Sequence, residues 1–211
     1  MRIYTKEEVP QRGDEWFAVR SLKLTASNAE IIQANGKGLE TLCKDLVTEF
    51  VSDIQIETFT TADMQRGIEL EPIAREKANG LFKCEYQEIG FVELDNRTGV
   101  SPDGVLFDKD GNITDLIEIK SPNDKNFMEQ FVSGTIPKKY ISQMQMQMMI
   151  TGAKKCRYFA YNENIKPYYF SKVIEVDVEI QEKLKKGIEH GKQIIDEYLT
   201  EYFKKVEGIE K

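Results

Sequence analysis

The sequence has 211 residues, with 36 acidic and 29 basic side chains and a net charge of −7. This length suits one domain with a buried core. The acidic balance argues against a protein that coats nucleic acid nonspecifically, although it leaves room for a local basic channel. Since the chain lacks a bilayer-spanning apolar run and its first eight residues lack a signal-peptide core, we expect a cytoplasmic protein.

Cysteine and histidine usage narrows the kinds of site to expect. Cys43, Cys84 and Cys156 are odd in number and far apart, which favours buried thiols in a reducing compartment over disulfides or a zinc site. The one histidine, His190, lies in a charged C-terminal segment, which disfavours histidine-based catalysis. Carboxylates are therefore the expected metal ligands, and they suit Mg²⁺ or Mn²⁺.

The first helices are predicted from charge and capping patterns. Residues 14–20 begin with two acids and end with an arginine, which suits a helix macrodipole, and Trp16 within them is expected to anchor the core. A second helix is predicted to start at Ser27, a capping residue, and to end at the turn 35–38.

Two longer helices and a strand are expected next. Apolar residues recur at three- and four-residue intervals over 39–51, a strong amphipathic helix signal. Residues 62–79 predict another helix with Gly80 as its stop, and Pro72 inside it predicts either a kink or a later start. Residues 82–94 alternate loosely and predict a strand or hairpin.

The stretch 101–122 predicts a hairpin with charged side chains at its ends. Two short apolar runs flank the turn 110–112, whose Asp-Gly and Gly-Asn pairs favour hairpin formation. The hairpin would bring Asp103 and Glu118 to one side of a sheet. Glu118 and Lys120 are two residues apart, so they would share one strand face while the isoleucines beside them face the other way.

The rest of the chain alternates between helices and strands. The predicted order is a short helix at 126–132, a helix at 138–150, strands at 156–161 and 168–176, and a helix of about 178–206 packed on the core. The Gln-Met alternation within 138–150 would also suit a strand, but its length and its flanking proline and glycine favour a helix. The whole order indicates one α/β domain with a mixed sheet.

On the predicted helix 138–150, side chains spaced four residues apart form two neighbouring stripes. Tyr140, Met144 and Met148 share one stripe, and Gln143 and Gln147 share the next.

The hairpin has the elements for hydrolysing a phosphodiester. Asp103 and Glu118 can hold one or two Mg²⁺ ions, which polarise a phosphate and lower the pKa of a bound water. Lys120 can orient that water or stabilise negative charge as it develops. The alternative is a surface hairpin whose Glu118 and Lys120 form an ordinary pair, because a Glu-x-Lys triplet alone is common.

The order of several short motifs resembles the lambda-exonuclease family of phage-type recombination nucleases, the YqaJ-like group of the PD-(D/E)xK superfamily. The resemblance covers about residues 14–175 and implies a nuclease core with a central mixed β-sheet flanked by helices. The matching segments are Trp16 to Arg20, Thr25-Ala26-Ser27, Gly67 to Glu71, Ser101-Pro102-Asp103-Gly104, Glu118-Ile119-Lys120-Ser121-Pro122, Tyr140 to Gln145 and Arg157-Tyr158-Phe159-Ala160.

The resemblance implies a role for each hairpin residue. Asp103, Glu118 and the Ile119 carbonyl would be metal ligands, and Lys120 would position the attacking water. Glu71 would lie near a second metal, in contact with it directly or through a water. Without the family match, Glu71 would be read as a solvated helix acid.

The resemblance also implies two DNA-binding groups. Four polar residues would hold the terminal 5′-phosphate: Arg20, Ser27, Ser101 and Gln143. A guanidinium, two hydroxyls and an amide suit that anion, although Arg20 and Ser27 have ordinary readings as a helix-end charge and a helix cap. Met64 and Lys37 are candidates for wedging apart the duplex end, but they could equally be a core methionine and an exposed loop lysine.

The implied activity is Mg²⁺-dependent, processive 5′ to 3′ digestion of linear double-stranded DNA, leaving a 3′ strand for a single-strand annealing partner. The family further implies a ring-shaped homotrimer encoded by a phage or prophage in a bacterial host. One rival is an endonuclease of the same superfamily, and another is a catalytically inactive DNA-end-binding scaffold. Three scattered cysteines disfavour an iron–sulfur nuclease, which needs a four-cysteine cluster.

Overall fold

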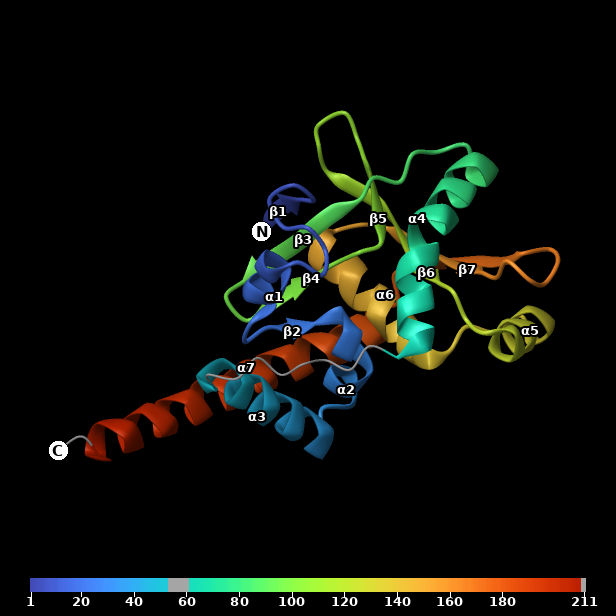
Figure 1. Ribbon diagram of the computed structural model, residues 1–211. Coiled ribbons are helices and arrows are strands. Elements are labelled where there is room, and N and C mark those ends of the chain that lie inside the picture. The colour runs from blue at the N-terminus through green and yellow to red at the C-terminus, as the bar shows by residue number, and fades with distance from the viewer. Residues whose placement is uncertain (53–60, 210–211) are drawn as a thin grey trace.

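The computed structural model describes residues 1–52 and 61–209, and its strands form two four-stranded sheets (Figure 1). The first sheet mixes parallel and antiparallel pairs. Its order is β1 (Arg2–Thr5), β3 (Ile89–Asp95), β4 (Thr98–Val100) and β2 (Leu24–Thr25).

The second sheet contains the predicted hairpin. Its order is β5 (Gly104–Phe107), β6 (Ile113–Lys120), β7 (Lys155–Tyr161) and β8 (Tyr169–Glu175). The hairpin β5–β6 and the pair β7–β8 are antiparallel, whereas β6 and β7 are parallel. At the hairpin turn, the Asp108 carboxylate accepts hydrogen bonds from the backbone N–H groups of Asp110 and Asn112, which fixes the turn. The predicted α/β fold is confirmed, with its mixed strands divided between two sheets.

Seven α-helices and one short 3₁₀ helix are found in the described part of the chain. They are α1 (Asp14–Arg20), the 3₁₀ helix η1 (Ala26–Asn28), α2 (Ala29–Ala34), α3 (Lys37–Val51), α4 (Ala62–Phe82), α5 (Asp124–Ser133), α6 (Lys138–Thr151) and α7 (Val178–Ile209). Figure 1 shows α7 beside α2 and α3, with its C-terminal end extending away from the sheets. Within residues 1–52 and 61–209, none of the helices has the length and apolar character needed to cross a membrane.

Several predicted boundaries need correction. The second helix begins as η1, so its α-helical part starts at Ala29 rather than Ser27. Helix α4 starts at Ala62, so the later start offered for Pro72 is wrong. The same helix passes through Gly80 and ends at Phe82, followed by the capping residue Lys83, which takes the left-handed conformation with a φ of 52°. Because the helix extends to Phe82, the strand predicted from that residue begins only at Ile89.

The two faces of β6 pack against different helices, as its alternation predicts. Ile117 and Ile119 face Ala74 and Ala78 of α4 in one apolar cluster. Glu118 points to the opposite face, where Gln147 of α6 reaches it. The helix α6 is confirmed over the alternative strand, and it buries its methionines in a larger cluster that also draws on α2, α3 and α7. The Glu118 side chain therefore lies between its own strand, β6, and the buried helix α6.

The free cysteines follow the expectation only in part. Cys43 and Cys156 are buried, whereas Cys84 is partly exposed. Burial raises the pKa of the Cys43 thiol to about 11, which keeps it protonated and unreactive. His190 is exposed and bonds to Asn35 rather than to any part of the hairpin.

Candidate active site

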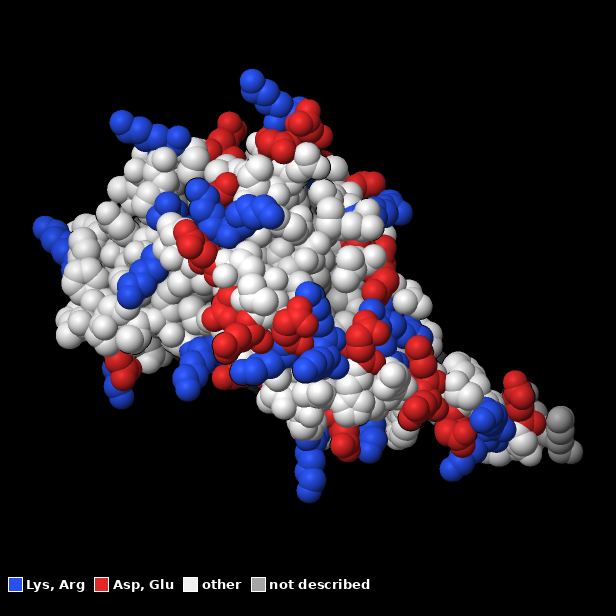
Figure 2. All heavy atoms as spheres, turned by 180° about the vertical axis from the view of Figure 1, so that it is seen from behind, with Lys and Arg blue, Asp and Glu red and all other residues white. Residues whose placement is uncertain are grey.

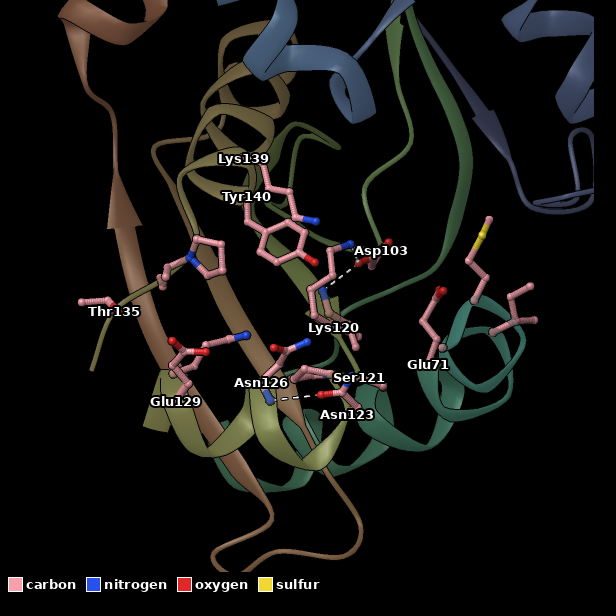
Figure 3. Close-up of a pocket in the computed structure, with 18 of the residues that line it drawn as sticks. Glu71, Asp103, Lys120, Ser121, Asn123, Asn126, Glu129, Thr135, Lys139 and Tyr140 are labelled. Carbon is pink, nitrogen blue, oxygen red and sulfur yellow. Dashed lines mark hydrogen bonds and ion pairs between the residues drawn. The ribbon is translucent and has the colours of Figure 1, made fainter. Parts of the chain in front are cut away.

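An open cleft with a volume of about 890 Å³ lies at the end of β6. Its walls come from α4, the segment after β6, α5 and the start of α6. Figure 3 shows Asp103 and Lys120 beside each other in this cleft, with Glu71 reaching in from α4 and Glu129 from α5. Of the three residues that the hairpin prediction singled out, Asp103 and Lys120 therefore border a space large enough for a ligand, whereas Glu118 does not line it.

Lys120 lies between the two hairpin carboxylates. Its Nζ atom is 4.0 Å from Asp103 Oδ2 and forms an ion pair with Glu118 Oε1. Asp103 Oδ2 also accepts a hydrogen bond of 2.6 Å from the backbone N–H of Ile119. Glu118 is fully buried, whereas Asp103 and Lys120 keep 14% and 25% of their side chains exposed. The predicted meeting of Asp103, Glu118 and Lys120 is confirmed.

These three groups carry an excess of negative charge in a poorly hydrated place. Burial and the neighbouring Glu118 carboxylate raise the pKa of Asp103 well above its ordinary value. Burial alone would lower the pKa of Lys120, but the carboxylates of Glu118 and Asp103 outweigh burial and raise it. One lysine therefore leaves the carboxylate pair incompletely neutralised.

The donor set fits a hard divalent cation. The Asp103 and Glu118 carboxylates repel each other beside the cleft, and they provide oxygen ligands and an excess of negative charge that such an ion would neutralise. A third acid does not join them: across residues 1–52 and 61–209, no group of three or more His, Cys, Asp or Glu residues is arranged to hold a metal. The metal-ligand roles of Asp103, Glu118 and the Ile119 carbonyl stay predictions.

Glu71 lines the cleft but is bound by arginines. Its Oε1 atom accepts from Arg75 at 2.8 Å, and its Oε2 atom accepts from Arg12 at 2.7 Å. Arg75 also donates from Nε to the backbone carbonyl of Asp103 at 2.8 Å, which ties α4 to the hairpin. Arg12 has a positive φ of 68° and is 41% exposed at its side chain, so it approaches Glu71 from the open side. A role for Glu71 beside a second metal stays a prediction.

Sequence reasoning gave no role to Gln147, although it placed this residue on one stripe with Gln143. Gln147 Nε2 donates to Glu118 Oε2 at 2.8 Å, and both side chains are fully buried. The sequence held one signal for such a role: Gln147 lies four residues after the predicted site residue Gln143, on a helix with many apolar residues.

A second polar cluster joins three of the segments in the predicted family pattern. Arg20 Nη2 lies 3.5 Å from Ser27 Oγ and 3.3 Å from the hydroxyl of Thr25. The Arg20 guanidinium stacks 3.9 Å above the Trp16 ring, and Trp16 Nε1 donates to Ser101 Oγ at 3.2 Å. Burial lowers the pKa of Arg20 to about 10, so the guanidinium still carries its charge at neutral pH.

Trp16 was predicted to anchor the core, and that prediction is wrong. It is only half-buried, and none of the residues of α1 is buried. Its ring instead supports Arg20 and Ser101, so its apolar face and its N–H group serve the polar cluster.

The remaining predicted residues are less closely placed. Gln143 is half-buried on α6, which packs against η1, but no hydrogen bond within the described residues joins it to Arg20, Ser27 or Ser101. Met64 lines the cleft and is 53% exposed, so the reading as a core methionine is wrong. Lys37 is exposed at the start of α3. The roles of Met64 and Lys37 at a duplex end stay predictions.

Comparisons with known proteins agree on the fold and the family. Residues 15–154 match the family model of the YqaJ-like viral recombinase domain. An alkaline exonuclease (LHK-Exo) from Laribacter hongkongensis is similar at 31% identity and a TM-score of 0.77, over 92% of this chain and 100% of that one. Its complex with dAMP gives 30% identity and a TM-score of 0.81 over the same shares.

A phage-related exonuclease from Haemophilus somnus 129PT shares the fold at 13% identity and a TM-score of 0.67, over 88% of this chain and 98% of that one. A search of proteins with curated functions finds no match. The architecture is thus the α/β fold of these exonuclease structures. The chain belongs to the YqaJ-like viral recombinase domain family.

Proposed function

We propose that residues 1–211 act as one nuclease domain that digests one strand of linear double-stranded DNA from its 5′ end and leaves a 3′ overhang for recombination. The observation that carries the proposal is the meeting of Asp103, Glu118 and Lys120 beside one open cleft, which Asp103 and Lys120 line and behind which Glu118 is buried. The family and the exonuclease relatives support the reaction class. The proposal includes action in the cytoplasm of a bacterial host, on phage or prophage DNA.

Asp103 and Glu118 would hold Mg²⁺, for which Mn²⁺ would substitute, with the Ile119 carbonyl as a further ligand and Glu71 near a second ion. When bound, the ion polarises the scissile phosphate and lowers the pKa of a water. Lys120, kept protonated by both carboxylates, would orient the attacking water and stabilise negative charge that develops on the phosphate.

The water oxygen would bond to phosphorus as the bond to the 3′ oxygen of the terminal nucleotide breaks, and that oxygen takes up a proton. The product is a 5′-mononucleotide, and the shortened strand again ends in a 5′-phosphate. Because each cut regenerates the same terminal group, one phosphate pocket would serve every cycle, which suits processive digestion.

The pocket for that phosphate would be the cluster around Arg20. Its guanidinium provides the charge, and the Ser27 hydroxyl provides a directional hydrogen bond. Ser101 would provide another by turning its hydroxyl away from the Gly90 carbonyl, to which it donates at 2.8 Å, and Gln143 would add an amide. Met64, exposed on the cleft wall, would contact the duplex end, with Lys37 as the second candidate.

The first test is digestion of 5′-phosphorylated linear DNA beside its closed circular form, with and without Mg²⁺. We expect nucleotide release only from linear DNA with Mg²⁺, and loss of release in Asp103→Ala and Lys120→Ala. Cutting of the circular form would favour the endonuclease instead. Binding of DNA ends without any release by the wild type would favour the scaffold.

End selection is tested by comparing 5′-phosphorylated with 5′-hydroxyl DNA. A hydrogen bond to a charged group contributes about 1.5–3 kcal/mol, so Arg20→Gln should reduce the preference for the phosphate roughly 10- to 100-fold. Lys109→Gln, which removes the same charge from the exposed hairpin turn, is the matched control and should leave the preference unchanged. An unchanged preference in Arg20→Gln would remove this residue from the pocket.

The proposed assembly is a homotrimeric ring that works with a single-strand annealing protein. On the face shown in Figure 2, acidic and basic side chains lie side by side, so that face does not present a uniformly basic surface to DNA. A ring would let basic side chains line the inside while the net negative charge stays outside. A strictly monomeric mass by light scattering at working concentration would contradict this assembly.

A further inference from the structure

A buried amide in the middle of α6 lies beside the proposed metal site. Met144, Met146 and Met148 of this helix are buried, and Gln147 is buried among them with no exposed surface. Placing an amide in such surroundings is unfavourable unless it forms hydrogen bonds. Gln147 Nε2 donates to Glu118 Oε2 at 2.8 Å, whereas Gln147 Oε1 has no partner within the described residues. The contact to Glu118 is thus the interaction that offsets burial of this amide.

Glu118 is held at both of its oxygens. Lys120 binds Oε1 from the same strand, and Gln147 binds Oε2 from the facing helix. Contacts from two different elements restrict rotation of the carboxylate about the last side-chain torsion of Glu118, whereas a single contact would leave it freer to rotate.

The chemistry of the second contact matters for cation binding. A lysine or arginine at position 147 would neutralise Glu118 and remove the charge that a metal needs. A methionine, like the neighbouring residues, would fill similar space but leave Oε2 without a donor. A glutamine orients the carboxylate and leaves its charge unchanged.

We propose that Gln147 is a positioning residue that fixes the orientation of Glu118 for binding of a divalent cation. This inference rests on the proposed metal-dependent function, and it assigns Gln147 no contact with DNA. A partner that orients a metal ligand typically changes metal affinity about 10- to 100-fold when it is removed.

The same helix offers a matched control. Gln145 is also buried, at 1% exposure, but its amide donates to the Glu175 carbonyl at 2.7 Å and accepts from the Asp177 N–H at 2.9 Å. Those contacts join α6 to the last residue of β8 and to the segment that follows it. Gln145→Met and Gln147→Met therefore make the same substitution in the same helix, and only the second one affects Glu118.

The experiment measures Mn²⁺ affinity by calorimetry on the full chain without DNA, together with thermal unfolding. We expect Gln147→Met to weaken Mn²⁺ binding about 10- to 100-fold, and Gln145→Met to lower the unfolding temperature with Mn²⁺ affinity within about twofold of wild type. In the Glu118→Gln background, Gln147→Met should cause no further loss of affinity, because its effect passes through Glu118.

Wild-type affinity in Gln147→Met, or equal losses in the two methionine variants, would overturn the proposal. If Gln147→Met does not fold, Gln147→Asn provides the measurement, since its shorter amide cannot span to Glu118. Nucleotide release by the same proteins is recorded separately. A wild type that binds Mn²⁺ but releases no nucleotide would defeat the proposed function and leave the positioning role to be decided by affinity.

Discussion

Replacing Asp103 with asparagine should stabilise the metal-free protein while abolishing Mg²⁺-dependent nucleotide release. Burial and the Glu118 carboxylate raise the pKa of Asp103 in the folded state. An acid whose folded pKa lies above its unfolded pKa destabilises the fold once the pH exceeds the unfolded value, which is about 3.9 for aspartate. At neutral pH the metal-free wild type therefore bears a cost that asparagine removes.

The geometry sets the size of this effect. Asparagine keeps an oxygen that can accept the 2.6 Å hydrogen bond from the Ile119 N–H, and Lys120 keeps its ion pair with Glu118. The attraction lost is that between Lys120 and Asp103 across 4.0 Å. The repulsion relieved and the attraction lost oppose each other, so we expect a net gain of roughly 1 kcal/mol, within the usual range for a single substitution. For a chain of this length, this corresponds to a rise of about 2–4 °C in the unfolding temperature.

The assay is thermal unfolding at neutral pH, first in a chelator and then with Mg²⁺. A cation that binds only the folded state adds about 2.7 kcal/mol at 100 times its Kd, so Mg²⁺ should raise the unfolding temperature of the wild type and not that of Asp103→Asn. Asp103→Ala, which also loses the bond to Ile119, should be less stable than Asp103→Asn in the chelator. The reasoning is refuted if Asp103→Asn unfolds at a lower temperature than the wild type in the chelator, or if Mg²⁺ stabilises both equally.

Two further predictions concern the packing of α7. A Cβ atom on Gly187 would lie 1.9 Å from the Ile32 carbonyl oxygen, so Gly187→Ala should destabilise the fold by about 3 kcal/mol in denaturant unfolding. A Cβ atom on Gly208 of the same helix would meet no atom within 4 Å, so Gly208→Ala should not destabilise the fold. Burial opposes ionisation of Asp95, but its 2.8 Å bond to Lys192 helps to lower its pKa. Asp95→Asn should therefore cost about 0.5–1 kcal/mol at pH 7, and the difference from wild type should disappear as the pH falls through the folded pKa, measured by unfolding between pH 2 and pH 7.

The hairpin could be predicted because its determinants are local. The turn chemistry of 108–112 and the two-residue alternation of 116–120 determine which strand face carries Glu118 and Lys120. The choice of a helix for 138–150 was also local, since Pro137 and Gly152 mark its ends. In these places, the sequence signal and the packing agree.

Other features depend on contacts that a linear pattern does not show. Gly80 looked like a helix stop, but α4 continues past it because Phe82 packs on Phe159 of β7, and Lys83 adopts the left-handed conformation instead. Trp16 looked like a core residue, and its actual position depends on Ser101, which is 85 residues away. The arginines that bind Glu71 could not be predicted from the sequence pattern either, since Arg12 is 59 residues away from Glu71 in the chain.

The connection between the two polar clusters bears on how much DNA each cut would remove. Ser101 belongs to the cluster around Arg20, and Asp103 belongs to the carboxylate pair proposed to bind the metal, with the buried Pro102 between them. Two residues span at most about 7 Å, so the backbone limits the distance between the proposed 5′-phosphate pocket and the proposed cutting site. Proline fixes its own φ, and the carbonyl of Asp103 is bound by Arg75, so this spacer is restrained. A short, restrained spacer suits removal of one nucleotide at a time, because only the phosphate next to the bound end would reach Asp103.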